Sequence, residues 1–375
     1  MDQIWNFSSG PGALPKSVLE QISRDVISWN DTGFSILEMS HRSDDFSHIC
    51  YEAECDLRDL LNLSHDYAII FTHAGGHGAN AFIPMNLMAR CYNRNADFIV
   101  SGHWSYTSYI EAKKYGNVRI AVDNNYILNH SDLKYKPRRW MPRLEDWRLS
   151  KQSSYVHLCS NETIDGIEFV DWPILSDMSV NSVLVVDASS NFLTRPLDIE
   201  KTGLVFACAQ KNIGVAGLTI VMIRKDLLEN FLPLCPSSFN YTNIFKANSL
   251  YSTPPIFPIY VASLMLKWLK LKGGLSIVAE ENKMKSSVFY DYLDSTDFYY
   301  NEVERSVRSR VNIPFMMKED ALTSVFLSEA KKLGLINLNG HRTIGGLRAS
   351  IYNAMPMSGV LSLIKYMRDF ECHYG

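Results

Sequence analysis

Short apolar runs alternate with helix-like segments over the first two thirds of the chain. Apolar runs without polar alternation are typical of strands that are buried on both faces of a parallel sheet. Each run is followed by turn-forming or polar residues and then by helical spacing. We therefore expect an α/β fold in which helices cover both faces of a mostly parallel sheet, with strands at 67–72, 97–100, 155–159, 183–187, 205–209 and 218–223.

The pattern changes after Pro254-Pro255. A long apolar segment at about 257–270 predicts a buried helix, and shorter mixed elements follow it. These are strand-like runs at 311–315 and 347–352, a helix at 320–333 and a last helix that ends near Glu371. The expected organisation is a large domain spanning 16–257 and a smaller α+β domain formed by 1–15 and 258–375.

Length and composition limit the function classes. At 375 residues the chain exceeds one typical core, which also favours two lobes. A charged fraction of 21% and a net charge of −3 argue against a nucleic-acid or membrane-surface protein. No apolar run reaches the ~20 residues that span a bilayer. The basic and aromatic segment 134–143 resembles an insertion, and a solvated loop is favoured over a nucleic-acid site.

The cysteines and the first residues indicate the compartment. Seven cysteines are dispersed without a CxxC spacing, which is typical of reduced thiols and not of a disulfide framework or a zinc site. The first residues, Met1 to Trp5, carry neither a basic start nor the apolar core of a signal peptide. We therefore expect a cytoplasmic protein without a metal site.

Asp187 and Lys211 form the pair with the clearest chemical meaning. Asp187 ends one apolar run, and Lys211 follows the next run in a turn of small residues. A lysine amine forms a Schiff base with the aldehyde of pyridoxal phosphate, while a carboxylate keeps the ring nitrogen protonated so that the ring accepts electrons. Taken alone the pair is weak evidence, because most such lysines are solvated surface charges.

Six motifs strengthen this interpretation, because together they resemble phosphoserine aminotransferases. The resemblance runs in order from residue 3 to the C-terminus, at compatible spacing. The motifs are Asn6-Phe7-Ser8-Ser9-Gly10-Pro11-Gly12, Ser40-His41-Arg42-Ser43, Asn161-Glu162-Thr163-Ile164-Asp165-Gly166, Ala209-Gln210-Lys211-Asn212-Ile213-Gly214, Thr253-Pro254-Pro255 and the segment from Gly340 to Ala354.

The resemblance implies a fold-type I pyridoxal 5'-phosphate enzyme that works as a homodimer with active sites at the subunit interface. It implies exchange of 3-phosphohydroxypyruvate and glutamate for phosphoserine and 2-oxoglutarate, in serine biosynthesis. In many bacteria, relatives also form 4-phosphohydroxythreonine for vitamin B6 synthesis. The implied partners are therefore glutamate, phosphorylated 2-oxo acids and a second copy of the chain.

The resemblance also implies which residues hold the cofactor. Backbone groups would bind the phosphate, an aromatic ring would stack on the cofactor, and hydroxyl, amide and carboxylate side chains would contact its polar atoms. The matching positions are Gly76, His77, Trp104, Thr163, Asp187, Gln210, Lys211, and, reaching the partner subunit's cofactor, Ser252 and Thr253. The chain departs from the expected pattern at His77, where an Arg or small polar residue is usual, at Ala79-Asn80, and at Ser252, where Asn is usual.

The substrate side must hold two anions, and arginine matches both carboxylate and phosphate geometry. The resemblance implies that Arg348 binds the α-carboxylate. It assigns the side-chain anion to two His-Arg pairs, His41-Arg42 and His341-Arg342, partly from the other subunit. Histidine protonation would let one pocket accept a phosphate and a carboxylate in turn. The amine of Lys211 would act as base and then as acid.

The residues alone leave two other interpretations of the function open. One is a different enzyme of the same fold, such as a cysteine desulfurase or a serine–glyoxylate aminotransferase; the His-Arg pairs and the lack of a cysteine in a glycine-rich loop argue against both. The other is a non-catalytic protein that binds the cofactor, which predicts loss of Lys211 or Arg348. Both residues are present.

Overall fold

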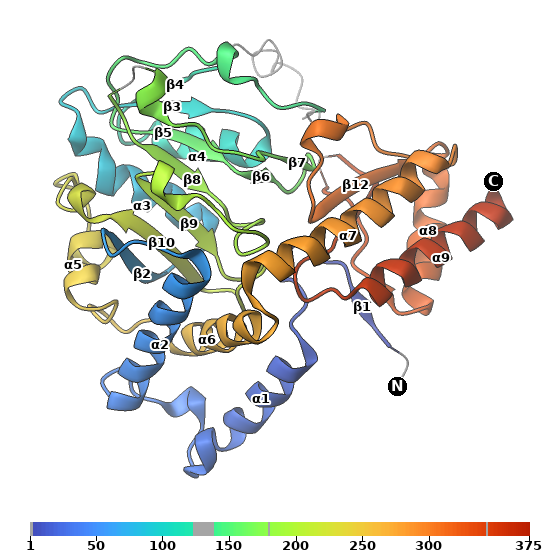
Figure 1. The fold of residues 1–375 in the computed structure, drawn as a ribbon, viewed down its shortest axis with the longest axis horizontal. Coiled ribbons are helices and arrows are strands. Elements are labelled where there is room, and N and C mark those ends of the chain that lie inside the picture. The colour runs from blue at the N-terminus through green and yellow to red at the C-terminus, as the bar shows by residue number, and fades with distance from the viewer. Residues whose placement is uncertain (1–2, 123–138, 179–180, 343) are drawn as a thin grey trace.

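The computed structural model describes residues 3–122, 139–178, 181–342 and 344–375. A seven-stranded sheet forms the centre of its larger part, in the order β2-β10-β9-β8-β5-β3-β4 (Figure 1). The strands are β2 (Tyr67–His73), β3 (Asn95–Ile99), β4 (Asn117–Ile120), β5 (Val156–Cys159), β8 (Leu184–Asp187), β9 (Leu204–Cys208) and β10 (Leu218–Arg224). Each predicted apolar run overlaps one of these strands, with ends that differ by at most two residues, and the mostly parallel α/β sheet is confirmed.

One strand, β10, runs antiparallel to both of its neighbours, β2 and β9. The other pairings in the sheet are parallel. The segment 209–217 that joins β9 to β10 is too short for the crossover that a parallel neighbour needs. The short connection therefore explains the reversal, and it places Lys211 in the turn between the two strands.

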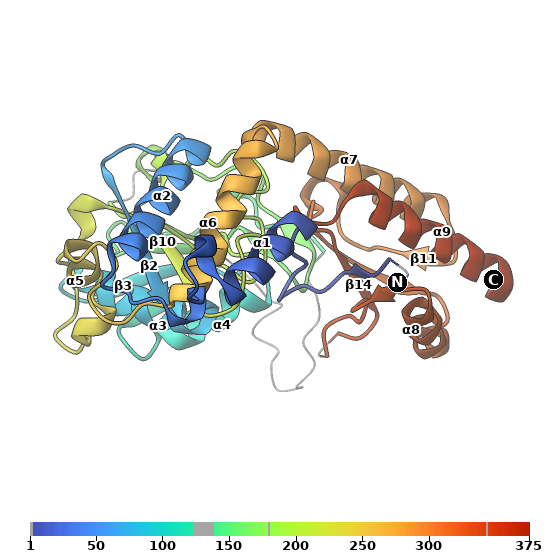
Figure 2. The same cartoon turned by 90° about the horizontal axis from the view of Figure 1, so that it is seen from below.

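Helices cover both faces of this sheet (Figures 1 and 2). Alternate residues of β2 face opposite sides: Ile69 and Phe71 belong to one buried cluster, and Ala68 and Ile70 to another. The first cluster includes α2 (Asp44–Leu61) and α6 (Ile256–Leu271), with α1 (Lys16–Ile27) packed against it. The second includes α3 (Gly76–Leu87), α4 (His103–Ala112) and α5 (Tyr241–Lys246).

The C-terminal part forms a separate apolar cluster that also contains Phe7 from the N-terminal segment. A three-stranded antiparallel sheet, β11-β12-β14, packs there with three helices. Its elements are β11 (Tyr299–Tyr300), β12 (Asn312–Met317), β14 (Leu347–Ser350), α7 (Gly274–Ser295), α8 (Thr323–Lys332) and α9 (Met357–Tyr374). The remaining strands of the described residues form two short pairs. They are β1 (Trp5–Asn6) with β13 (Leu335–Ile336), and β6 (Asn161–Glu162) with β7 (Ile167–Glu168).

The long helix α7 joins the two parts of the molecule (Figure 1). Its first turns contribute Leu275 and Val278 to the cluster beneath the large sheet, and its last turns contribute Phe289 to the C-terminal cluster. Between them, Lys285 is buried, and its Nζ donates hydrogen bonds to the carbonyls of 351, 352 and 355 at 3.2, 2.9 and 2.9 Å. The predicted division at 257–258 stays a prediction; the buried side chains of α6 pack with the large sheet.

Within the described ranges, no helix is long and apolar enough to cross a bilayer. The first half of the basic and aromatic segment 134–143, residues 134–138, lies outside the described residues. Of its described part, Arg139 forms an ion pair with Glu302, and Trp140 is 45% exposed.

Candidate active site

A cavity of about 210 Å³ opens at the carboxyl ends of β5, β8 and β9. This is the edge where ligands bind in open α/β sheets. Side chains from the large sheet, from the N-terminal segment and from the C-terminal part line it. They are Ser9, Gly10, Gly76, His77, Trp104, Cys159, Asn161, Thr163, Ile164, Asp187, Ser189, Ser190, Cys208, Gln210, Lys211, His341 and Arg348.

Lys211 lines the cavity from the turn after β9. Its Nζ donates a hydrogen bond to Oγ1 of Thr163 at 3.0 Å and lies 5.9 Å from the centre of the Trp104 ring. The N–H of Gly12 donates to the Gln210 carbonyl at 2.8 Å, and a Cβ on Gly12 would lie 2.8 Å from the Lys211 carbonyl oxygen. The N-terminal segment therefore packs against the backbone at Lys211, and the Lys211 amine faces the cavity.

Asp187 ends β8 at the floor of the cavity and is 9% exposed. Its Oδ1 accepts a hydrogen bond from the N–H of Ser189 at 2.9 Å. Burial raises the pKa of this carboxyl group, while the Ser189 hydrogen bonds and the Lys211 charge lower it. A cationic ring nitrogen at this position would offset the cost of burial and keep the carboxylate ionised.

The N-terminus of α3 forms another side of the cavity, with Gly76 and His77 in its lining. The first N–H groups of a helix have no intrahelical acceptor, and together with the helix dipole they favour an anion. The turn before α3 is tight: Gly75 has φ 84°, and a Cβ on Gly78 would lie 2.1 Å from the Cβ of Ala74. This end of the cavity suits a phosphate group that backbone N–H groups would bind.

Two buried polar atoms in the lining lack a hydrogen-bond partner among the described residues, Nε1 of Trp104 and Oε1 of Gln210. Buried polar atoms are nearly always hydrogen-bonded in native proteins, so a ligand with both donor and acceptor groups would complete this site. A lysine, a buried carboxylate, an indole ring and a helix start together match the aldehyde, ring nitrogen, ring face and phosphate of pyridoxal phosphate. Within the described ranges, no cluster of His, Cys, Asp or Glu could hold a metal ion.

Arg348 supplies positive charge, and His341 a titratable ring, on the side formed by the C-terminal part. Arg348 lies on β14, and its Nη2 donates to Oγ of Ser9 at 2.7 Å. Burial lowers the pKa of His341, and the charges of Arg348 and Arg342 lower it further. His341 is therefore uncharged at neutral pH until an anion offsets these cations.

Five of the predicted residues do not line the cavity: His41, Arg42, Ser252, Thr253 and Arg342. His41 is half-buried, and the other four are exposed. His41 and Arg42 lie in the turn before α2, and Ser252 and Thr253 precede α6. A single chain therefore brings together the predicted cofactor residues from Gly76 to Lys211, with His341 and Arg348, and leaves the rest on its surface.

The sequence prediction assigned no role to several residues of the site. Ser9 and Asn161 line the cavity. Both lie inside motifs of the family resemblance, and those motifs could have indicated them as site residues. His103 lies beside the cavity: its ring centre is 5.1 Å from that of Trp104 and 5.5 Å from that of His341. Burial lowers the pKa of His103, as do His341 and His77. Only its place next to Trp104 in the chain could have indicated it.

The thiol of Cys208 also lines the cavity, next to Ser189. Burial raises the pKa of Cys208 to about 11, and the negative charge of Asp187 adds to this effect. The thiol is therefore protonated at neutral pH and is a poor nucleophile. This protonation argues against desulfurase chemistry at the site.

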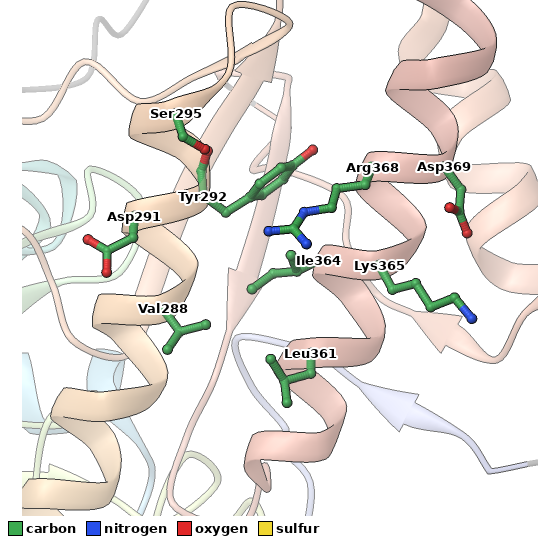
Figure 3. A pocket seen from close by; sticks show the side chains of 9 residues that line it. All are labelled: Val288, Asp291, Tyr292, Ser295, Leu361, Ile364, Lys365, Arg368 and Asp369. Atoms are coloured by element: carbon green, nitrogen blue, oxygen red, sulfur yellow. The ribbon is translucent and has the colours of Figure 1, made fainter.

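A second hollow of about 390 Å³ lies between α7 and α9, and Figure 3 shows its lining. Arg368 lies over the ring of Tyr292, with 5.4 Å between the guanidinium carbon and the ring centre. The lining combines acidic, basic and apolar side chains on the outer surfaces of two helices: Val288, Asp291, Tyr292, Ser295, Leu361, Ile364, Lys365, Arg368 and Asp369. It contains none of the predicted site residues.

The sequence profile described as "Aminotransferase class-V" matches residues 4–363. The chain belongs to the class-V aminotransferase family. Within this family, its curated relatives include the phosphoserine aminotransferase of Bordetella avium, which is 50% identical and covered over 100% of both chains. The phosphoserine aminotransferase of Paraburkholderia phymatum is 46% identical over 98% of this chain and 99% of its own.

Solved class-V aminotransferase structures agree with this assignment. The phosphoserine aminotransferase from Bacillus circulans subsp. alkalophilus has a TM-score of 0.92 at 36% identity, with 100% of this chain and 99% of that chain covered. The phosphoserine aminotransferase of Trichomonas vaginalis, solved with pyridoxal phosphate bound, has a TM-score of 0.90 at 35% identity, with 98% and 100% covered. The fold-type I architecture expected from the sequence is confirmed.

Proposed function

We propose that this chain is a phosphoserine aminotransferase. It exchanges the amino group of glutamate with 3-phosphohydroxypyruvate to give O-phospho-L-serine and 2-oxoglutarate, a step of serine synthesis, and it uses pyridoxal 5'-phosphate. The observation that carries this proposal is the cavity itself, where Lys211 and Asp187 face Arg348 and His341. An electron-accepting cofactor and an anionic substrate both find matching groups there.

Bound pyridoxal phosphate supplies an aldehyde that takes up the amino group and a ring that accepts electrons. The chain supplies the rest. Asp187 would hold the positive charge on the ring nitrogen, Trp104 would cover one ring face and keep water out, and the start of α3 would bind the phosphate. The Nζ of Lys211 would take the proton from Cα of the amino donor and pass it to the carbon of the cofactor's aldehyde group. Its hydrogen bond to Thr163 keeps it on the cavity side.

The substrate's α-carboxylate is assigned to Arg348, whose guanidinium is oriented by Ser9. A planar guanidinium binds a carboxylate through two parallel hydrogen bonds. The side-chain anion is assigned to His341 and Arg342, with His41 and Arg42 from a second copy. Since His341 is uncharged in a cationic environment, arrival of a phosphate would favour its protonation.

We also propose a homodimer with shared sites. Support comes from the position of Arg42, Ser252 and Thr253, which are exposed and lie outside the cavity of their own chain. An isologous dimer would carry these residues of one copy to the cavity of the other. A cytoplasmic location belongs to the same proposal, supported by seven free cysteines.

A subunit-mixing experiment tests the shared site. Lys211→Ala and Thr253→Asp chains, each inactive alone, are co-expressed with different tags and the mixed dimer is purified. If Thr253 serves the partner's site, one site of each mixed dimer has both defects and the other has none. Activity should then return to about half that of the wild-type dimer. Homodimers of each variant are the controls, and a mixed dimer without activity would show that each chain builds its own site.

The two anion sites are separated by comparing amino donors. Arg348→Ala should lower kcat/KM for glutamate and phosphoserine about equally, because both carry an α-carboxylate. Arg42→Ala should lower it more for phosphoserine, whose phosphate has the greater charge. Each loss should be about 10- to 100-fold, the size expected when hydrogen bonds to a charged group are removed.

The matched control for the arginine variants is Arg305→Ala, which removes an exposed arginine paired with Asp294 in the C-terminal part. It should leave both donors unaffected. Arg342→Ala should resemble Arg42→Ala. A donor ratio that shifts in Arg348→Ala and stays constant in Arg42→Ala would reverse the assignment of the two sites.

The function itself is tested by a coupled assay on the purified protein. Phosphoserine and 4-phosphohydroxythreonine are supplied separately as amino donors to 2-oxoglutarate, and glutamate formation is followed. Phosphoserine turnover above that of unphosphorylated serine supports the proposal. Absence of turnover with both phosphorylated donors, in protein saturated with pyridoxal phosphate, would contradict it.

A further inference from the structure

The loop 161–166 contains two buried carboxylates, Glu162 and Asp165, that no step above uses. Both bind the first turn of α4. Oε2 of Glu162 accepts from the N–H of Trp104 at 2.8 Å, and Oε1 accepts from the N–H and the hydroxyl of Ser105 at 2.9 and 2.6 Å. Oδ2 of Asp165 accepts from the N–H of His103 at 3.3 Å. Three successive N–H groups at the helix start are thus held by side chains of a distant loop.

The residue that precedes α4 explains why the acceptors come from elsewhere. A helix is usually capped by a polar side chain at the position before its first turn, but that position is Gly102. A Cβ there would lie 2.4 Å from Oδ2 of Asp165 and 2.7 Å from Cδ of Glu162. The two carboxylates therefore occupy the space of the missing side chain, in direct contact with the backbone.

The arrangement is more than a helix needs for its own stability. One serine or aspartate at the cap is enough for an ordinary helix, and two buried carboxylates repel each other. Burial raises the pKa of Glu162 to about 7, and the charge of Asp165 adds to this effect. The N–H groups and the positive end of the α4 dipole favour the ionised forms. Because burial of two like charges costs free energy, this pair of carboxylates indicates that the start of α4 must be placed accurately.

The same loop also contacts the lysine and the C-terminal part. Thr163, between the two carboxylates, accepts the hydrogen bond from Nζ of Lys211 at 3.0 Å. On the other side, the Gly166 carbonyl accepts from the N–H of Ser309 at 2.8 Å, and Nδ2 of Asn161 donates to Oδ1 of Asn312 at 2.8 Å. One short segment therefore contacts the backbone of Trp104, the amine of Lys211 and strand β12. Strand β12 pairs with β14, which carries Arg348.

We propose that Glu162 and Asp165 are positioning residues that fix the indole of Trp104 relative to Lys211 across the cofactor cavity. The proposal rests on the proposed function, since Trp104 is taken to stack on pyridoxal phosphate. The carboxylates act on the backbone of α4 and touch neither substrate nor cofactor. Without them, the first turn of α4 would fray, and the indole would lose its fixed distance from the amine.

The test compares Glu162→Gln and Asp165→Asn with Glu168→Gln. Glu168 is a matched control, because it is also buried, lies on the adjacent strand β7, and binds Asn191, Arg195 and the N–H of Arg310 without touching α4. Three properties of each holoenzyme are measured: the melting temperature, the circular dichroism of the cofactor's visible band, and the dissociation constant of pyridoxal phosphate. None of these requires turnover, so the result is independent of which substrates the enzyme accepts.

We expect Glu162→Gln to weaken pyridoxal phosphate binding about tenfold and to reduce the visible dichroism, with a smaller effect for Asp165→Asn. Glu168→Gln should lower the melting temperature but leave both cofactor signals unchanged. Amide exchange in the peptide containing 103–108 should rise only in the loop variants. If Glu162→Gln does not fold, Asp165→Asn, which keeps a hydrogen-bond acceptor, carries the same comparison.

A double variant decides whether the effect acts through the indole. In Trp104→Phe, addition of Glu162→Gln should have little further effect on the dissociation constant, because the group that the carboxylate positions is already altered. Fully additive losses would overturn the proposal, as would equal losses of cofactor signals in Glu168→Gln. Unchanged cofactor signals in both loop variants would overturn it as well.

Discussion

Lys211→Ala is expected to abolish transamination while the protein stays folded. The variant removes the amine to which we assign both the bond to the cofactor and the transfer of the substrate proton. A positioned general base alone contributes about 100- to 10,000-fold to a rate. The fold should tolerate the change. Among the described residues the Lys211 side chain makes one hydrogen bond, to Thr163, and the N-terminal segment packs against the Lys211 backbone. Steady-state rates with glutamate, together with the melting temperature, measure both halves of the expectation.

The covalent bond provides an independent readout of this variant. Borohydride should attach pyridoxal phosphate irreversibly to the wild-type chain and not to Lys211→Ala, as mass spectrometry of the intact protein would detect. Lys201→Ala is the control, because Lys201 pairs with Asp198 and does not line the cavity. A reducible yellow adduct that persists in Lys211→Ala would mean that another lysine bonds to the cofactor.

Asp187→Asn is expected to lower kcat about 100-fold or more at saturating pyridoxal phosphate, because groups placed to stabilise charge in a transition state typically contribute 100- to 1,000-fold. The amide keeps the shape and can still accept from the N–H of Ser189. It lacks the negative charge that holds a proton on the ring nitrogen. The melting temperature should change little or rise, since burial disfavours the carboxylate without a cationic partner.

Cofactor occupancy must be measured alongside turnover in Asp187→Asn. An absorbance titration with pyridoxal phosphate establishes the fraction of loaded sites, and kcat is then expressed per loaded site. Asp198→Asn, at an exposed carboxylate paired with Lys201, is the matched control and should behave as wild type. Near-normal turnover in fully loaded Asp187→Asn would show that this carboxylate serves only the structure.

The agreement between predicted and observed elements has a physical basis. Strands buried on both faces admit few polar residues, so the runs at 67–72, 183–187 and 218–223 match β2, β8 and β10 to within one residue at each end. Boundaries were less readable: the predicted helix at 320–333 begins as a 3₁₀ turn at 320–322, and α8 covers 323–332. Both conformations accept the same polar pattern, so composition does not separate them.

The lining of the cavity was predictable where one residue type stands at a fixed place in a motif. Lys211, Asp187 and Trp104 line one cavity, and the roles that the resemblance implies for them stay predictions. The contributions of Glu162, Asp165 and His103 were not predicted. Glu162 accepts a hydrogen bond from the hydroxyl of Ser105, which lies 57 residues away in the chain. Nothing in the neighbouring sequence marks this contact.

By itself the sequence determined the family and most strands of the large sheet, and it predicted the residue types of the chemistry, because these depend on local pattern and on motifs that stand together along the chain. Only the tertiary structure decided which of those residues share one cavity in a single chain, and which, such as Arg42 and Thr253, lie outside it. It also decided that Gly102 leaves room for two carboxylates at the start of α4. Such contacts join segments far apart in the chain, and their distances follow from packing, which no local pattern records.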